Sequence, residues 1–240
     1  ELVEDALRKL ATEGRAQRID KQYGVRFSLS ELKRELERTG HSYNTSQLKE
    51  ALEICSKASL KLTRKSDGAI ASQTQTIFPQ YTEAKRANWI ESKTQFAVEF
   101  HGLVTKSIEQ KSFRQINYER SMQLSNALAR WLHKRMSHNY RQAQAFSNTY
   151  TLGLATIVRD SGMTARARVS DNRKAVRKAL EELKKPPQQQ GEESQQVIFQ
   201  WEEEEIKEGR SLLDVKFHLQ PSLVFTQEMK RANAKTKMIR

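Results

Sequence analysis

The chain has 240 residues, and its 42 lysines and arginines against 29 aspartates and glutamates give a formal net charge of +13 at pH 7. It has a single cysteine, Cys55, which excludes an intramolecular disulfide framework, and it lacks both a signal-peptide pattern and any apolar run near the roughly 20 residues that a membrane span needs. We therefore expect a helix-rich cytoplasmic protein of one or two domains and, because the chain begins at Glu1 and not at Met, a fragment or processed product.

Residues 1–80 show the order of elements of a winged helix, the helix-turn-helix variant that ends in a β-hairpin. Apolar residues at helical spacing predict helices over 2–13, 30–40 and 45–57, with a short β-prone stretch before the second helix. The alternating stretch SLKLTRK, a turn signal and the stretch AIASQTQTIF then predict a hairpin. The order of these elements, more than any one of them, predicts an N-terminal winged-helix domain.

The same order returns after a polar connector over 81–95. The expected elements are strand 96–100, a small helix, strand 113–118, helix 118–144, strand 149–153, helix 154–162, helix 171–185 and a hairpin over 197–219. We predict a C-terminal winged-helix domain over 96–225 with a mobile Gln-rich insertion at 186–196, followed by a basic tail over 226–240. The predicted fold class is mainly α with small β-hairpins (α+β), in two tandem winged-helix domains.

The excess of positive charge indicates a polyanionic partner. Each phosphate that a lysine or arginine neutralises releases condensed counterions, which makes double-stranded DNA the favoured partner. An anionic membrane surface is the competing interpretation, but the basic residues are spread over several segments instead of lining one amphipathic helix. We therefore expect no membrane association.

Three stretches carry a resemblance to a known family. INYERSMQLSNALARWLHKRMSHNYRQA, YTLGLATIVRDSGM and SDNRKAVRKALEEL, within 116–184, resemble plasmid replication initiator (Rep) proteins with tandem winged helices. The first domain matches in architecture only. The resemblance implies a bacterial, plasmid-associated protein that binds origin repeats (iterons), assists duplex opening, and recruits the host initiator protein and the replicative helicase. It also implies that the stripe led by Trp131 is core, and that Arg130 and Lys134 at most touch backbone phosphate.

The third helix of a winged helix enters the major groove, so its exposed face must read bases. In the second domain the predicted base-reading residues are Asn172, Arg173, Lys174 and Arg177. The predicted phosphate-binding residues there are Arg166, Arg168 and Lys178. The alternative interpretation is an ordinary solvated basic face, and only the position of the helix in the third-helix slot favours DNA.

The first domain offers a less basic third helix. Its predicted base-reading residues are Asn44, Ser46, Gln47 and Lys49, although Asn44 and Ser46 would equally serve as helix caps. Further phosphate contacts are predicted at the hairpin tips, from Lys65 in the first domain and from Lys207 and Arg210 in the second. The acidic run Glu202–Glu205 would repel DNA, so we expect the second hairpin to point toward a protein partner or solvent.

Catalytic interpretations have little support in the sequence. It has no GxxxxGK[ST] loop and no His-x-His pair, so we expect no enzyme activity, no metal and no cofactor. The main alternative function is a winged-helix transcriptional repressor, which would be a homodimer on an inverted repeat. A DNA-nicking or recombination enzyme is a further alternative.

Overall fold

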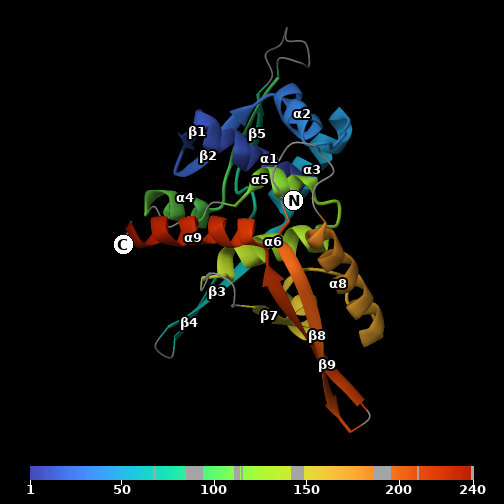
Figure 1. Cartoon of the computed structure of the whole chain (residues 1–240). Coiled ribbons are helices and arrows are strands. Elements are labelled where there is room, and N and C mark those ends of the chain that lie inside the picture. Colours follow the sequence, from blue (N-terminus) through green and yellow to red (C-terminus); the bar gives the residue numbers. More distant parts are fainter. Residues whose placement is uncertain are drawn as a thin grey trace. The chain divides into compact units, whose positions relative to one another are not determined.

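The computed structural model of the chain is mixed helix and sheet, and it divides into two compact units, Glu1–Phe113 (unit 1) and Arg114–Arg240 (unit 2) (Figure 1). It describes residues 1–66, 69–84, 94–110, 114, 116–141, 149–185, 196–209 and 211–238, with the side chains of 62–73 and 235–238 excepted. Among the helices of these residues, none combines the length and the apolarity that crossing a membrane requires.

Three helices of unit 1 pack against one another: α1 (Leu2–Leu10), α2 (Leu29–Arg38) and α3 (Thr45–Lys57). Each buries the apolar face that its sequence predicts. The fully buried side chains include Leu7, Leu32, Leu36, Leu48 and Leu52. Helix α1 continues into one distorted turn, Ala11–Arg15, where Gly14 has φ +86°, a conformation that favours glycine. The predicted helices of unit 1 are therefore confirmed within a few residues.

A four-stranded antiparallel sheet completes unit 1, in the order β1 (Ala16–Ile19), β2 (Gln22–Phe27), β6 (Gln95–Glu99), β5 (Tyr81–Ala84). The Phe96 ring stacks between Phe27 and Tyr81, with centroid distances of 5.9 Å and 6.2 Å. Helix α4 (Gly102–Glu109) packs on β2, where the Thr105 hydroxyl accepts from the Tyr23 amide at 2.8 Å. The predicted hairpin, β3 (Ser59–Ser66) and β4 (Ala69–Thr76), forms a separate two-stranded sheet.

This arrangement differs from the predicted domain boundary. Residues 81–84 and 95–99, expected in a connector and in the second domain, are strands of the unit 1 sheet. The physical reason is that Phe96 and Val98 are two residues apart and so lie on the same face of β6. They are buried when β6 pairs with β2, whose Val25 and Phe27 are also buried. Unit 1 therefore extends past residue 80 to Phe113.

Unit 2 is built from five helices and a three-stranded antiparallel sheet of order β7-β9-β8 among its described residues (Figure 1). The elements are, in order, α5 (Tyr118–Gln123), α6 (Ala127–Asn139), β7 (Tyr150–Gly153), α7 (Leu154–Asp160), α8 (Val169–Lys184), β8 (Ile198–Glu208), β9 (Ser211–Pro221) and α9 (Leu223–Met238). From α6 to β9 the predicted order of helix, strand, helix, helix and hairpin is observed.

The helix predicted over 118–144 is two helices, and the strand predicted over 113–118 is not formed at Tyr118, where α5 begins. The break between the helices is stabilised by capping. Asn126 Oδ1 accepts from the Leu128 amide at 2.9 Å, and the Glu182 carboxylate of α8 accepts from the Ser125 amide at 2.5 Å. A carboxylate at a helix N-terminus also interacts favourably with the helix dipole. The start of α6 therefore depends on a residue of α8, which local spacing does not reveal.

The segment predicted as a basic tail, 226–240, belongs mostly to α9, which packs into unit 2. Phe225 and Met229 are buried in the unit 2 core, and the Tyr140 and Phe225 rings stack at 6.4 Å. Glu228 accepts two hydrogen bonds from Arg120, at 2.8 Å and 2.9 Å. The apolar side chains of α9 explain the difference, because burying them on unit 2 removes them from water. The predicted insertion at 186–196 lies, except for Gln196, outside the described residues.

Candidate nucleic-acid interface

Helix α8 has one apolar face and one basic face. Its apolar face is formed by Val176, Ala179, Leu180 and Leu183, all of them buried in the unit 2 core. Its basic face carries Arg173, Lys174, Arg177 and Lys178. The helix begins at Val169 without a side-chain cap, and Ser170 and Asp171 lie inside its first turn. The helix therefore owes its position to the packing of its apolar face.

The turn before α8 is closed by Asn172, which is only 7% exposed. Its Oδ1 accepts from the Arg166 amide at 2.9 Å, and its Nδ2 donates to the Arg166 carbonyl at 3.0 Å. Both polar atoms of the side-chain amide are thus used inside the protein. This corrects the prediction that Asn172 reads bases: its role is to hold the main chain at Arg166, which places the exposed Arg166 side chain beside α8.

Arg173 and Arg177 are held by the acidic run on β8. Arg173 donates from Nε and Nη2 to Glu203 Oε2, at 2.9 Å and 2.5 Å, and from Nη1 to Glu205 Oε1 at 2.6 Å. Arg177 donates from Nε to Glu203 Oε1 at 2.8 Å and from Nη2 to Glu203 Oε2 at 2.5 Å. The Arg177 and Arg173 guanidinium groups, by hydrogen bonding and charge, lower the pKa of Glu203 to about 2. The pair of arginines and the carboxylates therefore form one ionic network at neutral pH.

The other basic residues near α8 are more exposed. Lys174 has a side chain 74% exposed, with Nζ 3.9 Å from the Asp171 carboxylate. Arg166, Arg168 and Lys178 are also exposed. Lys207, on β8, pairs with Glu205 at 2.6 Å. Exposed cations thus lie in the turn before α8, at Arg166 and Arg168, and on the helix itself, at Lys174 and Lys178.

The basic residues of α6 have different surroundings. Arg130 is 7% exposed and donates to the carbonyls of Leu124 at 2.6 Å and Ser125 at 3.1 Å. These bonds hold the break before α6, so the implied contact of Arg130 with phosphate is corrected to a structural role. Lys134, on the same helix, is half-buried. The apolar stripe itself is confirmed as core, because Leu128, Leu132 and Met136 are buried with Trp131 packed beside them.

In unit 1 the predicted residues gather at the start of α3. Asn44 and Gln47 form a capping box: Asn44 Oδ1 accepts from the Gln47 amide at 2.8 Å, and Gln47 Oε1 accepts from the Asn44 amide at 2.9 Å. Ser46 is exposed, and Lys49 Nζ lies 3.9 Å from Glu83 Oε1 of β5. Capping thus accounts for the side-chain oxygens of Asn44 and Gln47. The Lys65 side chain and Arg210 lie outside the described parts of the chain.

Glu203 and Glu205 are the residues that the sequence-based prediction misplaced. The acidic run was expected to point away from the DNA-facing surface, whereas Glu203 and Glu205 face α8. Side chains alternate along a strand, so residues two apart share a face. That alternation is the signal available in the sequence, since it separates Glu203 and Glu205 from Glu202 and Glu204. The partner of that face becomes visible only when β8 is placed beside α8 (Figure 1).

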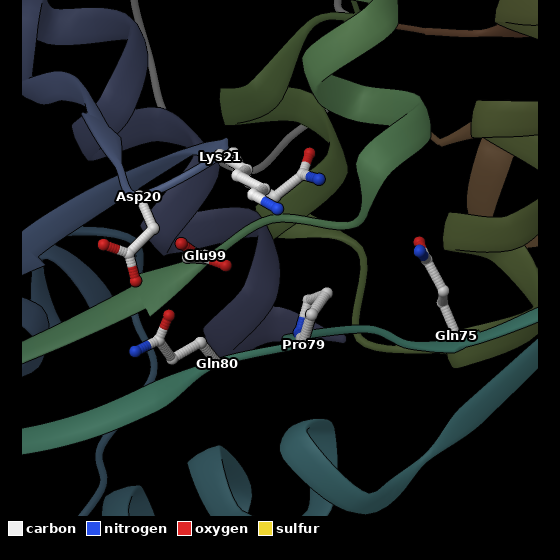
Figure 2. Close-up of a pocket in the computed structure, with 7 residues that line it drawn as sticks. Asp20, Lys21, Gln75, Pro79, Gln80 and Glu99 are labelled. Atoms are coloured by element: carbon white, nitrogen blue, oxygen red, sulfur yellow. The ribbon is translucent and has the colours of Figure 1, made fainter.

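Unit 1 also contains an open pocket of about 620 Å³, with Asp20, Gln80 and Glu99 together on one side and Gln75 on the other (Figure 2). When its amide nitrogen faces the two carboxylates, Gln80 donates to Glu99 Oε1 and Asp20 Oδ2, each at 3.2 Å. Burial and the Asp20 charge raise the pKa of Glu99. In that orientation Gln80 bridges the two acids, and none of the residues predicted to bind DNA lines this pocket.

Comparison with known proteins gives a likeness of fold. No protein-family model and no curated protein matches the chain. Domains 2 and 3 of RctB, solved as selenomethionine derivatives, match with a TM-score of 0.53 and 9% identity, over 92% of this chain and 80% of that chain. The Pi initiator protein in complex with iteron DNA matches with a TM-score of 0.47 and 13% identity, over 93% of this chain and 92% of that one. The fold of this chain is therefore similar to that of domains 2 and 3 of RctB.

Proposed function

We propose that this chain is a replication initiator of the plasmid Rep type that binds double-stranded origin repeats through two winged helices. In unit 2, the order α6, β7, α7, α8, β8, β9 and the sheet order β7-β9-β8 support assignment to a winged helix. In unit 1, the order α1, β2, α2, α3 and the β3–β4 hairpin support the same assignment. The sequence resemblance to Rep proteins over 116–184 adds to this, and the net charge of +13 suits a phosphate backbone.

The observation that carries the proposal is the basic face of α8, on which Lys174, Arg177 and Lys178 are exposed. The helix lies after a turn and before a long hairpin, the position from which a recognition helix enters the major groove. There Lys174 and the Nη1 edge of Arg177 would read bases, because both cations are suited to the acceptors of guanine. Arg166, Arg168 and Lys178 would bind phosphates and set the register of the protein on the duplex.

Helix α3 would read a second groove through Ser46, Lys49 and the side-chain amide nitrogen of Gln47. Two unlike recognition helices in one chain would read an asymmetric repeat, which fits direct repeats better than a palindrome. The protein would act without an active site of its own, by holding the duplex and by recruiting the host initiator protein and the replicative helicase. Its place of action would be the bacterial cytoplasm, on the plasmid.

Nuclease footprinting on the origin of the replicon that encodes this chain tests the proposal. We expect protected direct repeats. Protection of one inverted repeat by a dimer would favour the repressor instead, and absence of protection would contradict both functions.

A matched pair of variants tests the role of α8 in the same assay. Replacing Arg168 and Lys178 by Gln should lower the slope of log affinity against log salt by about 2, because each lost phosphate contact lowers it by about 0.9. Replacing Lys184 and Lys185 by Gln removes the same charge from the far end of the helix and should change the slope less. Equal changes in both variants would contradict the placement of the interface at the start of α8.

A further inference from the structure

Glu203 is the most enclosed member of the ionic network on unit 2. Its side chain is 9% exposed, against 20% for Arg173 and 44% for Arg177. One carboxylate accepts from both guanidinium groups, and Arg173 donates from all three of its nitrogens to Glu203 and Glu205. Charge-assisted bonds of this kind orient the planar guanidinium groups as well as bind them. Glu203 therefore sets the position of both arginines on the basic face of α8.

The geometry separates the two arginines. The three side-chain nitrogens of Arg173 already donate to carboxylates, so Arg173 acts as a bridge between α8 and β8. Arg177 uses Nε and Nη2 for Glu203, which directs its remaining edge, at Nη1, away from that carboxylate. A guanidinium that is fixed along one edge presents the other edge in a defined direction.

The network also changes the charge that α8 offers to a duplex. Two guanidinium groups face two carboxylates, so the charges of Arg173 and Arg177 are largely compensated at neutral pH, whereas Lys174 and Lys178 stay exposed on the same helix. Non-specific binding depends almost entirely on cations that neutralise phosphates, whereas base readout depends on the direction of individual hydrogen bonds. Compensating these arginines should weaken binding to an arbitrary duplex more than binding to a recognised one.

We propose that Glu203 is a specificity-determining positioning residue: it holds Arg177 for base readout through Nη1 and withdraws the charge of Arg173 and Arg177 from non-specific phosphate binding. The inference rests on the proposed function, because it requires that α8 meets a DNA duplex. It assigns to the acidic run of β8 a role in discrimination between duplexes.

The test compares Glu203→Gln with Glu202→Gln in the full chain. Glu202 is exposed and next in sequence, and its replacement removes the same charge without removing an acceptor of the α8 arginines. Affinities are measured for a duplex that the wild-type protein selects from a randomised library and for a scrambled duplex of equal length, over a range of salt concentrations. Thermal unfolding of each variant shows whether it is folded.

For Glu203→Gln we expect several-fold tighter binding to the scrambled duplex and a salt slope steeper by about 0.9, as for one additional phosphate contact. Affinity for the selected duplex should rise less or fall, so that the ratio of the two affinities drops. Glu202→Gln should leave this ratio nearly unchanged. In a variant with Arg173 and Arg177 both replaced by Gln, the further change Glu203→Gln should no longer alter the ratio. A merely structural role of Glu203 would not predict this dependence on the two arginines.

If Glu203→Gln does not fold, Glu203→Asp replaces it in the comparison. Aspartate keeps the charge but is one methylene shorter, so it should release one arginine and lower the ratio by a smaller factor. The inference is overturned if the Glu203 variant has a ratio of selected-duplex to scrambled-duplex affinity equal to or above that of Glu202→Gln. This holds for Glu203→Gln and for Glu203→Asp where that variant is used, and in either case the proposed function stands. A wild-type protein that selects no duplex would overturn the proposed function itself.

Discussion

Replacement of Asn172 by Ala distinguishes a structural role for this residue from a role in base reading. The variant loses two hydrogen bonds to the main chain of Arg166, at 2.9 Å and 3.0 Å. Each contributes about 1 kcal/mol net, and because Arg166 is exposed, water can replace part of what is lost. We expect the free energy of unfolding of unit 2 to fall by about 1–2 kcal/mol. Asn172→Asp keeps an acceptor for the Arg166 amide but loses the donor to its carbonyl. Its free energy of unfolding should therefore lie between those of the wild type and Asn172→Ala.

The assay is urea unfolding followed by tryptophan fluorescence in a Trp89→Phe background, so that the signal comes from Trp131 and Trp201, which are both in unit 2. Lys174→Ala is the control on the same helix: its side chain is 74% exposed, so stability should stay within about 0.5 kcal/mol of the wild type while duplex affinity falls. If instead Asn172→Ala unfolds like the wild type and loses base discrimination as Lys174→Ala does, the structural assignment of Asn172 is refuted.

Three further predictions concern the two units. Glu228→Gln leaves the Arg120 guanidinium, 4% exposed, without a carboxylate, and should lower the free energy of unfolding in urea by about 3 kcal/mol. Arg159→Gln breaks an ion pair at a site 73% exposed and should lower it far less. His133 is fully buried, and burial lowers its pKa to about 3, so the unfolded chain binds more protons between pH 6.5 and 3 and stability falls as pH drops below 6.5. His133→Leu should therefore raise the melting temperature more at pH 5 than at pH 8, and an equal rise would contradict this. A fragment over 1–113 should unfold cooperatively by circular dichroism and one over 1–80 should not, because the shorter fragment lacks β6; cooperative unfolding of 1–80 would speak against this division.

Local spacing was sufficient for the parts of the fold that depend on neighbours in sequence. Apolar residues three and four apart predicted α1, α2, α3 and α8, and the stripe of Leu128, Leu132 and Met136 predicted the core face of α6. The same spacing separated the basic face of α8 from its buried face. These predictions succeeded because the period of a helix or strand fixes, from the sequence spacing alone, which residues share a face.

Tertiary structure decided what each face meets. Glu203 lies 30 residues from Arg173 in the sequence. Strand β6 pairs with β2, although most of the sequence of unit 1 lies between the two strands. Arg130 and Asn172 were predicted to contact DNA, yet each binds main-chain groups six residues before it, and Glu182 binds the Ser125 amide, 57 residues before it. The sequence by itself thus determined most of the helices, their buried faces and the excess of positive charge. Which of those charges are compensated within the protein was decided by the folded structure, because that depends on side chains distant in sequence meeting in space.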